Sequence, residues 1–185
     1  MPKIIQTTVY TLAELEAMGN PTAITKAMCW LREVAVDDGW WDTIYMDAEN
    51  IGAKILAFDT YHYTIKFRLQ HDAPTVALAI KREHGEACET YKLAADFLSK
   101  YDDYHGVNGK ITLINRDAVT ASDLHPLNEL EDEWGEIERK FEKDLGQEYL
   151  AMLKDDYDAR LEDNYIRELA ASNEYTFTNM GKRFG

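Results

Sequence analysis

Apolar residues recur every three or four positions over much of the chain, and this spacing predicts amphipathic helices. Thr11 and Glu14 have the spacing of a capping box, which opens a short helix that a glycine ends. Asn20 followed by a proline is typical of the next helix start, so a helix is expected over 21–36. The stripe continues over 40–56 and predicts a helix that packs on 21–36 as a hairpin.

Alternation of polar and apolar residues, in contrast, predicts strands. The segment 61–69 (YHYTIKFRL) alternates without a break. Runs rich in branched residues predict strands over 4–10 and over 110–115, and the latter could pair with 61–69 or with the N-terminal strand. Helices are expected at 74–83 and 86–101, and a glycine-containing loop is expected at 102–109.

A long helix is the main feature of the second half. From residue 128 to 171 apolar residues step by three or four, which predicts one amphipathic helix or two nearly collinear ones, weakest at Gly135 and Gly146. These 44 residues would extend roughly 66 Å, so the rest of the chain, a second copy or a partner must cover the apolar stripe. Alternating Tyr175 and Phe177 predict that the tail returns as an edge strand.

Together these elements predict an α+β fold: an N-terminal helical hairpin with a small antiparallel sheet, followed by a long acidic amphipathic helix or helix pair. The composition changes near residue 123, because 123–174 holds 17 acidic and 6 basic side chains. We therefore expect two domains, an α+β head over 1–122 and an acidic helical region with a C-terminal tail strand over 123–185.

The charge of the chain directs attention to protein partners. With 20 basic and 34 acidic side chains, the net charge of −14 repels nucleic-acid phosphates and anionic membranes, so direct binding to either is not expected. The carboxylates of the long helix could instead mimic phosphates against the basic channel of a nucleic-acid enzyme. The candidate protein-binding residues are Trp40 and eleven carboxylates: Glu129, Glu131, Asp132, Glu133, Glu136, Glu138, Asp155, Asp156, Asp158, Glu162 and Asp163.

Each candidate has an ordinary structural alternative. The acidic helix could be a solvated face, which is favoured by the i,i+4 pairs Glu136–Lys140, Asp156–Arg160 and Asp163–Arg167. Trp40 stands next to another tryptophan, and such residues are either interface aromatics or part of a core.

Catalytic and metal-binding patterns do not stand out in the sequence. The five histidines are scattered and the two cysteines form no CxxC pair, so we expect no metal site and no cofactor. Cys29 and Cys88 are expected to be buried, reduced thiols, with a disulfide as the alternative. No signal peptide and no 18-residue apolar run are seen, which favours the cytoplasm.

Several segments resemble a family of small acidic proteins encoded by phages and prophages, often described as antitoxins. These segments are VYTLAEL, DDGWWD, DAENIGAKIL and the C-terminal EYLAMLKDDYDARLEDNYIRELAASNEYTFTNMGKRF. The resemblance implies a mobile-element origin and a role against the host, and it carries over no catalytic residue. Where members of the family have a glycine-rich aromatic segment after the second helix, this chain has YHYTIKFRLQHDAPTVA.

We therefore predict a non-enzymatic phage-type protein in the host cytoplasm. It would bind and inhibit a host protein with a basic surface, such as an anti-CRISPR or anti-restriction target, through its acidic helix. The first alternative is an antitoxin or self-associating regulator, a homodimer for example, that pairs through the apolar stripe of the long helix. The second is a small Mg²⁺-dependent hydrolase, since folding could gather carboxylates around the ion.

Overall fold

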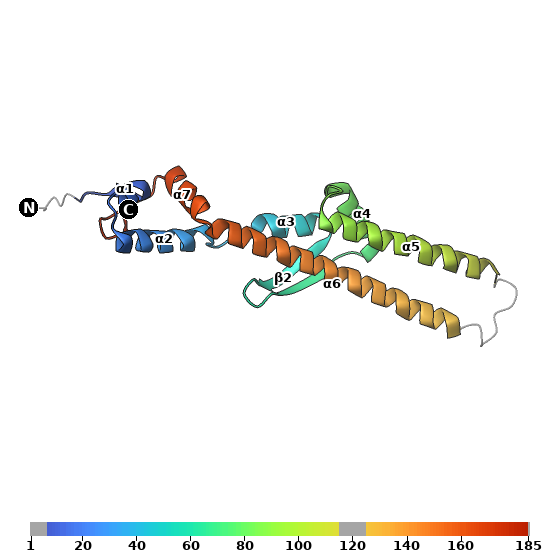
Figure 1. Ribbon diagram of the computed structural model, residues 1–185. Helices are drawn as coiled ribbons and strands as arrows, with labels where there is room; N and C mark the ends of the chain where they lie inside the picture. Colours follow the sequence, from blue (N-terminus) through green and yellow to red (C-terminus); the bar gives the residue numbers. More distant parts are fainter. Residues whose placement is uncertain (1–6, 115–124, 185) are drawn as a thin grey trace, which may run out of the picture. The chain divides into compact units, whose positions relative to one another are not determined.

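The computed structural model describes residues 7–114 and 125–184, and it describes side chains at 7–104 and 133–184 (Figure 1). Helices and small antiparallel sheets are combined, which confirms the predicted α+β class. The chain forms two compact units: unit 1 comprises 1–41 and 154–185, and unit 2 comprises 42–153. Unit 1 thus joins both ends of the chain. The domain boundary predicted between residues 122 and 123 lies outside the described residues.

The described residues of unit 1 form three helical segments besides the end of α6, and a three-stranded sheet. Its elements are β1 (Tyr10–Thr11), α1 (Leu12–Ala17), α2 (Pro21–Ala35), α7 (Asp163–Ser172), β4 (Thr176–Phe177) and β5 (Arg183–Phe184). The strand order is β1-β4-β5, all antiparallel, with Tyr10 opposite Phe177. The predicted tail strand therefore exists, but as the central strand rather than an edge. Of the strand predicted over 4–10, Tyr10 alone lies in a described strand; residues 7–9 are irregular and 4–6 are outside the described part.

Local sequence signals set the helix starts of unit 1, as predicted. The Thr11 hydroxyl accepts a hydrogen bond from the Glu14 backbone N–H (3.3 Å), and the Glu14 carboxylate accepts one from the Thr11 N–H (2.8 Å). This second bond, helped by one from the Thr11 hydroxyl, lowers the pKa of Glu14. The Asn20 side chain accepts from the Ala23 N–H at the start of α2 (3.3 Å). Each bond satisfies a helix N–H that has no partner within its own helix.

The core of unit 1 packs α1, α2, α7 and β4 together. Trp30 makes edge-on contacts with Tyr175 and Phe177, with ring centroids 5.1 and 5.9 Å apart. The Arg183 guanidinium lies over the Trp30 and Tyr175 rings at 5.6 and 4.9 Å. The buried side chains are Leu12, Leu15, Ala23, Ala27, Met28, Leu31, Ala35, Ile166, Ala170 and Phe177.

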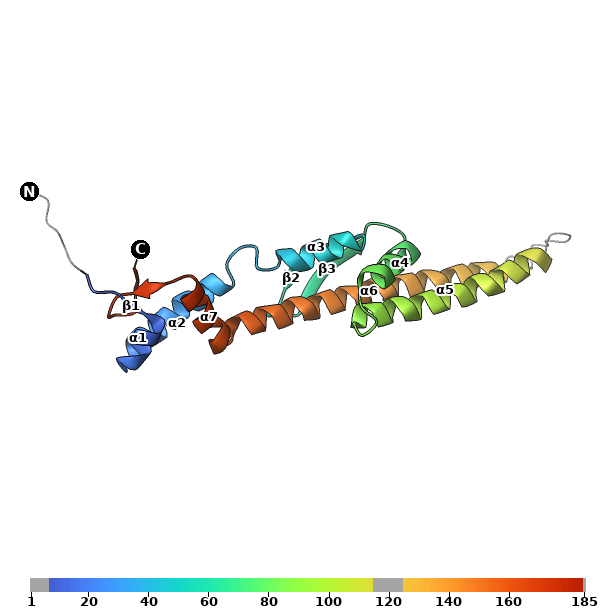
Figure 2. The same ribbon diagram turned by 90° about the horizontal axis from the view of Figure 1, so that it is seen from above.

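Unit 2 pairs one β-hairpin with helices. Its elements are α3 (Asp42–Asn50), β2 (Ala53–Asp59), β3 (Thr64–Leu69), α4 (Ala73–Glu83), α5 (Glu89–Ile114) and the larger part of α6 (His125–Leu161). Helices α5 and α6 lie side by side in both ribbon views (Figures 1 and 2). They are joined by stacked rings of Phe97 and Phe141, whose centroids are 4.4 Å apart. In β2 and β3, Ala53 stands opposite Leu69 and Ile55 opposite Phe67.

The helix predicted over 40–56 is wrong beyond Asn50. Gly52 takes a φ of 80°, which ends the helix, and the chain continues as β2. The residues of β2 fit a helical stripe as well as a strand, and the strand forms because β3 provides a pairing partner. The partner of β3 is thus β2, and neither 110–115 nor the N-terminal strand. Because α2 and α3 belong to different units, their hairpin packing stays a prediction.

The loop and strand predicted after residue 101 are also wrong. Residues 102–114 continue α5, and residue 115 lies outside the described part. Tyr101 and Tyr104, spaced three apart, contact Trp134 of α6 with ring centroids 5.4 and 5.0 Å away. The contacts with Trp134 are consistent with a helix at these residues, where the glycines of 102–109 had predicted a turn.

The long helix is interrupted once within 125–172, at Glu162 rather than at a glycine. Glu162 has φ −63° and ψ 139°, so the chain leaves helical geometry between α6 and α7. Gly146 lies inside α6, where its missing Cβ leaves room for Phe67. Within 133–172 the chain buries part of the apolar stripe, at Phe141, Leu145, Tyr149 and Leu153, whereas Met152 is exposed.

Candidate protein-binding surfaces

The predicted acidic residues separate into two groups, one in each unit. Asp155, Asp156, Asp158, Glu162 and Asp163 belong to unit 1, whereas the carboxylates before residue 154 belong to unit 2. Glu129, Glu131 and Asp132 lie outside the described side chains. Glu133, Glu136 and Glu138 thus form one described group, and the five candidates after residue 154 form another.

In unit 1, most of these carboxylates already have basic partners. Asp156 pairs with Arg160 (2.8 Å), as the i,i+4 spacing predicted, and Asp158 pairs with Lys154. Asp155 and Glu162 are exposed and make no ion pair with a described residue. Three of the five candidate carboxylates of unit 1, with Asp163 described next, are therefore paired within the chain.

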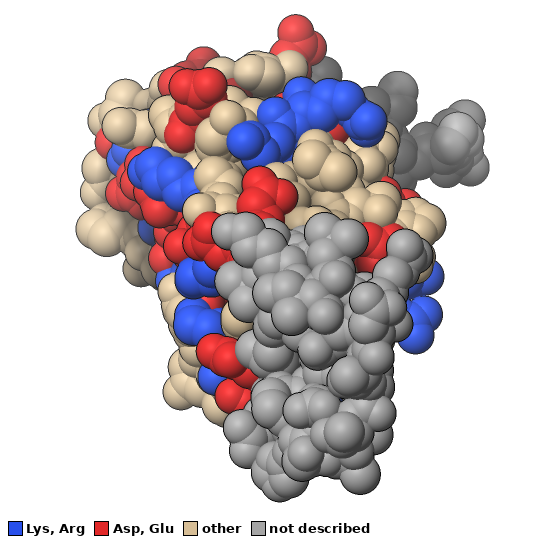
Figure 3. Space-filling model, turned by 90° about the vertical axis from the view of Figure 1, so that its right-hand side faces the viewer, with Lys and Arg blue, Asp and Glu red and all other residues tan. Residues whose placement is uncertain are grey.

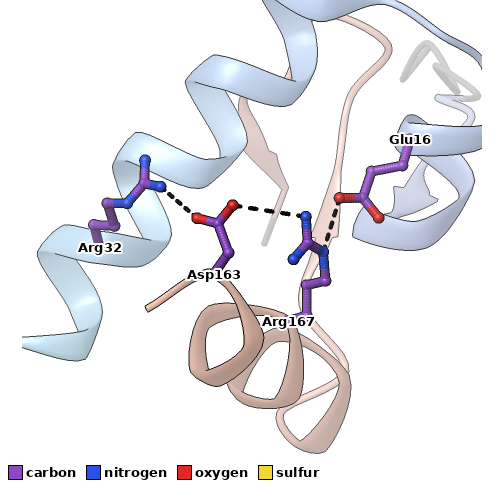
Figure 4. Close-up of polar contacts among 4 residues, drawn as sticks. All are labelled: Glu16, Arg32, Asp163 and Arg167. Carbon is purple, nitrogen blue, oxygen red and sulfur yellow. Dashed lines mark hydrogen bonds and ion pairs between the residues drawn. The ribbon is translucent and has the colours of Figure 1, made fainter. Parts of the chain in front are cut away.

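Asp163 belongs to an ion-pair network that links three helices (Figure 4). Its carboxylate lies 2.6 Å from Arg32 of α2 and 3.9 Å from Arg167 of α7, and Arg167 lies 3.1 Å from Glu16 of α1. The predicted Asp163–Arg167 pair is therefore present but is the longest link. Because Arg32 and Glu16 are more than 130 residues away in sequence, only the fold reveals this network.

Trp40 is a half-buried member of an aromatic cluster in unit 1. Its ring centroid lies 5.6 Å from that of Trp41 and 5.5 Å from that of Tyr157 in α6. It therefore contributes to internal packing, which was the structural alternative for this residue.

In unit 2, by contrast, the described candidate carboxylates make no ion pair with a described residue. Glu133 and Glu136 are exposed, and Glu138 is half-buried. The pair predicted between Glu136 and Lys140 is wrong, because Lys140 binds Asp144 instead and this hydrogen bond raises the lysine pKa. Unit 2 holds 22 of the 34 acidic side chains and 12 of the 20 basic ones. Acidic and basic side chains are interspersed over the face shown in Figure 3.

A groove runs between α5 and α6 beside Glu133. It encloses about 310 Å³, with an apolar floor of Leu93, Phe97, Ile137 and Phe141. Its rim carries Glu133 and two ion pairs, Lys100–Asp96 (2.5 Å) and Lys140–Asp144. An apolar floor with a charged rim is suited to the aliphatic stem and charged head of a long basic side chain.

The sequence analysis missed the turn of the β2–β3 hairpin. The Asp59 carboxylate accepts hydrogen bonds from the backbone N–H groups of Tyr61 and His62 (2.9 Å each) and lies 2.7 Å from Nδ1 of His62. Tyr63 has a φ of 56°, so β3 begins at Thr64 and not at residue 61 as predicted. Tyr61 and Tyr63 are exposed, whereas strict alternation had placed them with the inward face.

A partly buried polar cluster joins the helices of unit 2. The Tyr149 hydroxyl donates to Asp47 (2.7 Å), and Nδ1 of His84 lies 2.7 Å from the Thr90 hydroxyl. The other His84 ring nitrogen, Nε2, is buried without a hydrogen bond and lies 3.5 Å from Asp47. Burial and the Asp47 contact raise the pKa of Tyr149. Thr90 and His84 are largely buried whereas the Asp47 side chain is 37% exposed, so we interpret the cluster as a link between the helices.

Unit 1 also contains a cavity of about 690 Å³ between α1, α7 and β4. Ala13, Ala170 and Ala171 form much of its wall, and the Glu16–Arg167 pair lies at its edge. Small apolar walls with one internal ion pair select no particular class of ligand, so we assign it no role.

Cys29 and Cys88 are both exposed free thiols, so their predicted burial is wrong. Cys29 lies on a solvent-facing position of α2, and Cys88 precedes α5. Within the described ranges, no group of three or more His, Cys, Asp or Glu side chains is placed to hold a metal ion. Nor does any described helix combine the length and apolarity needed to cross a bilayer.

Comparison of the chain with protein-family models gives no match, and neither curated proteins nor solved structures give one.

Proposed function

We propose that this chain is a non-enzymatic binding protein that inhibits a host nucleic-acid-binding protein, of the kind found in CRISPR or restriction defence. The binding surface is the α5–α6 groove of unit 2 with Glu133 on its rim, together with Glu136, which is exposed three residues further along α6. The observation that carries this proposal is the contrast between the units: the candidate carboxylates of unit 1 are mostly paired internally, whereas those of unit 2 are not.

Charge complementarity supplies the mechanism. Unit 2 has an acidic excess of ten side chains, which steers a basic surface toward it. On contact, arginine or lysine heads of the partner pair with Glu133 and Glu136, and their stems lie on the Phe97 and Ile137 floor. A partner held in this way has its nucleic-acid-binding cations occupied. The phage-type setting is supported by the sequence resemblance alone.

The antitoxin or self-associating alternative stays a prediction, because the apolar stripe on which it rests is only partly buried by the chain itself. Phe141 packs on Phe97, and Tyr149 packs on Phe67 with ring centroids 5.5 Å apart, whereas Met152 is exposed.

An affinity capture with matched variants tests the proposal. Tagged protein is exposed to nuclease-treated host lysate at two salt concentrations. At about 0.1 M salt the electrostatic screening length is about 10 Å, and at about 0.5 M salt it is well below about 10 Å. We expect a basic nucleic-acid-binding protein to be retained at low salt and lost at high salt. The test variant is E133Q/E136Q. The control, D155N/E162Q, removes the same two charges from exposed, unpaired positions in unit 1. Equal retention by both variants would contradict the proposal.

A further inference from the structure

The outer face of the β2–β3 hairpin is basic, although unit 2 as a whole is acidic. Lys66 and Arg68 are exposed on β3 and alternate with the inward-facing Ile65 and Phe67. Lys54, half-buried on β2, stands directly opposite Arg68 in the strand register. Like charges directly opposite each other destabilise a strand pair, so folding alone gives no reason for this arrangement.

These three cations also lack internal partners. None of Lys54, Lys66 and Arg68 makes an ion pair or hydrogen bond with a described side chain. Elsewhere in unit 2, Arg82, Lys92, Lys100 and Lys140 each pair with a carboxylate within four residues. The chain has carboxylates in excess, yet no described carboxylate makes an ion pair with these three cations.

Exposed apolar and aromatic side chains lie next to the cations. At the turn, Tyr61 is 89% exposed and Tyr63 54%, and Leu56 is 50% exposed where β2 shifts register against β3. The hairpin crosses α6, against which Phe67 packs, and its turn extends past the helix (Figure 1). Large exposed aromatics beside unpaired cations are typical of binding surfaces, because both gain most when a partner removes water.

The Asp59 side chain caps the turn. Its carboxylate contacts the His62 ring and accepts two backbone hydrogen bonds, and these contacts lower the pKa of Asp59. A turn fixed in this way loses little conformational entropy on binding.

We propose that the outer face and turn of the β2–β3 hairpin form a second binding surface, which takes an acidic segment of a partner protein. Lys54, Lys66 and Arg68 pair with its carboxylates, and Tyr61 and Tyr63 pack on its apolar side chains. Successive residues on one face of an extended segment are about 6.8 Å apart, which matches the spacing of Lys66 and Arg68 along β3. A nucleic acid fits less well, because the net charge of −14 repels a long polyanion along its whole length. A short acidic segment contacts the basic face alone, and salt screens its repulsion from the rest of the chain.

This surface is independent of the α5–α6 groove, because its charge is opposite. The second binding surface is tested by selecting binders from a displayed library of random twelve-residue peptides. Peptides that also bind the K66E/R68E variant are removed during the selection. K66E/R68E places a glutamate opposite Lys54, so the hairpin is expected to remain folded. The control K26E changes an exposed, unpaired lysine in unit 1.

We expect the selected peptides to be rich in Asp and Glu. Synthetic copies of them should bind at least tenfold more weakly to K66E/R68E and several-fold more weakly to Y61A, with K26E like the wild type. Selection of basic or neutral peptides, no selection, or equal binding by K66E/R68E would overturn the proposal. So would hairpin-dependent binding of a twenty-residue oligothymidine that is tighter than that of the peptides, since this result assigns the surface to nucleic acid.

Discussion

Two glycines of α6 should respond in opposite ways to the same substitution. At Gly135 an added Cβ would have its nearest neighbour, Nη2 of Arg139, at 4.0 Å, which is ordinary contact. Alanine is favoured over glycine inside a helix by about 1 kcal/mol. We therefore expect Gly135→Ala to stabilise unit 2 by about 1 kcal/mol, since no steric cost opposes the gain in helix propensity.

At Gly146 the same gain meets a steric cost. The added Cβ would lie 3.1 Å from Cβ and 3.2 Å from Cγ of Phe67, closer than the roughly 3.5–4.0 Å that carbon atoms prefer. Phe67 is stacked on Tyr149, which is tied to Asp47, so it has little freedom to move. Overpacking of this kind costs about 1–3 kcal/mol. We expect Gly146→Ala to change stability by between about 0 and −2 kcal/mol, which is 1–3 kcal/mol below Gly135→Ala.

Hydrogen exchange of α6 amides, read by mass spectrometry, measures this difference within unit 2 even if the two units unfold separately. A double-mutant cycle supplies the control: Phe67→Ala removes Cγ and the ring, which leaves only the Cβ contact, so Gly146→Ala should recover part of the propensity gain in that background. Equal stabilisation by Gly135→Ala and Gly146→Ala, or an undiminished cost at Gly146 in the Phe67→Ala background, would refute the packing argument.

Three further changes probe the fold. Tyr149→Phe should cost about 1 kcal/mol near neutral pH through the lost hydrogen bond to Asp47. Because the folded-state pKa of Tyr149 is raised, its contribution to the free energy of unfolding is fully present below about pH 10. Above that pH the contribution falls by up to about 1.4 kcal/mol per pH unit. Denaturant titrations should therefore show that the variant loses less stability than the wild type as the pH rises above about 10. Gly181→Ala should lower the stability of unit 1 by more than about 2 kcal/mol in thermal unfolding, because Gly181 has a φ of 74° and a Cβ would meet the backbone of Ala23. Asp163→Asn should cost about 1 kcal/mol or less at low salt and nothing near 1 M salt, because its partners Arg32 and Arg167 are partly exposed.

The elements that depend on a few neighbouring residues could be predicted from the sequence. The Thr11–Glu14 capping box and the Asn20 cap are correct because each bond joins residues three apart. The start of β2 could not be predicted in this way, because a helical stripe and a strand compete there and distant pairing with β3 decides. The same holds where α5 continues past residue 101, because Tyr101 and Tyr104 contact Trp134, which is distant in sequence.

The binding surfaces show the same limit. The sequence gives the number of carboxylates but not their partners, so Asp163 and Glu133 looked alike. Folding brings Arg32 to Asp163 and leaves Glu133 exposed at a groove. The aromatic turn was missed because the alternation of 61–69 was extended through Tyr63, whose positive φ breaks the strand. The one local signal was Asp59 two residues before Tyr61, a spacing typical of side-chain-capped turns.

The most direct test of the proposed function is the dissociation constant of the captured host protein for three forms of the chain at about 0.1 M salt. If the unpaired carboxylates of unit 2 form the binding surface, E133Q/E136Q should bind roughly two- to thirtyfold more weakly than the wild type, as expected for two exposed charge pairs of about 0.2–1 kcal/mol each. D155N/E162Q should bind like the wild type. Unchanged binding by E133Q/E136Q, or a larger loss with D155N/E162Q, would contradict the account.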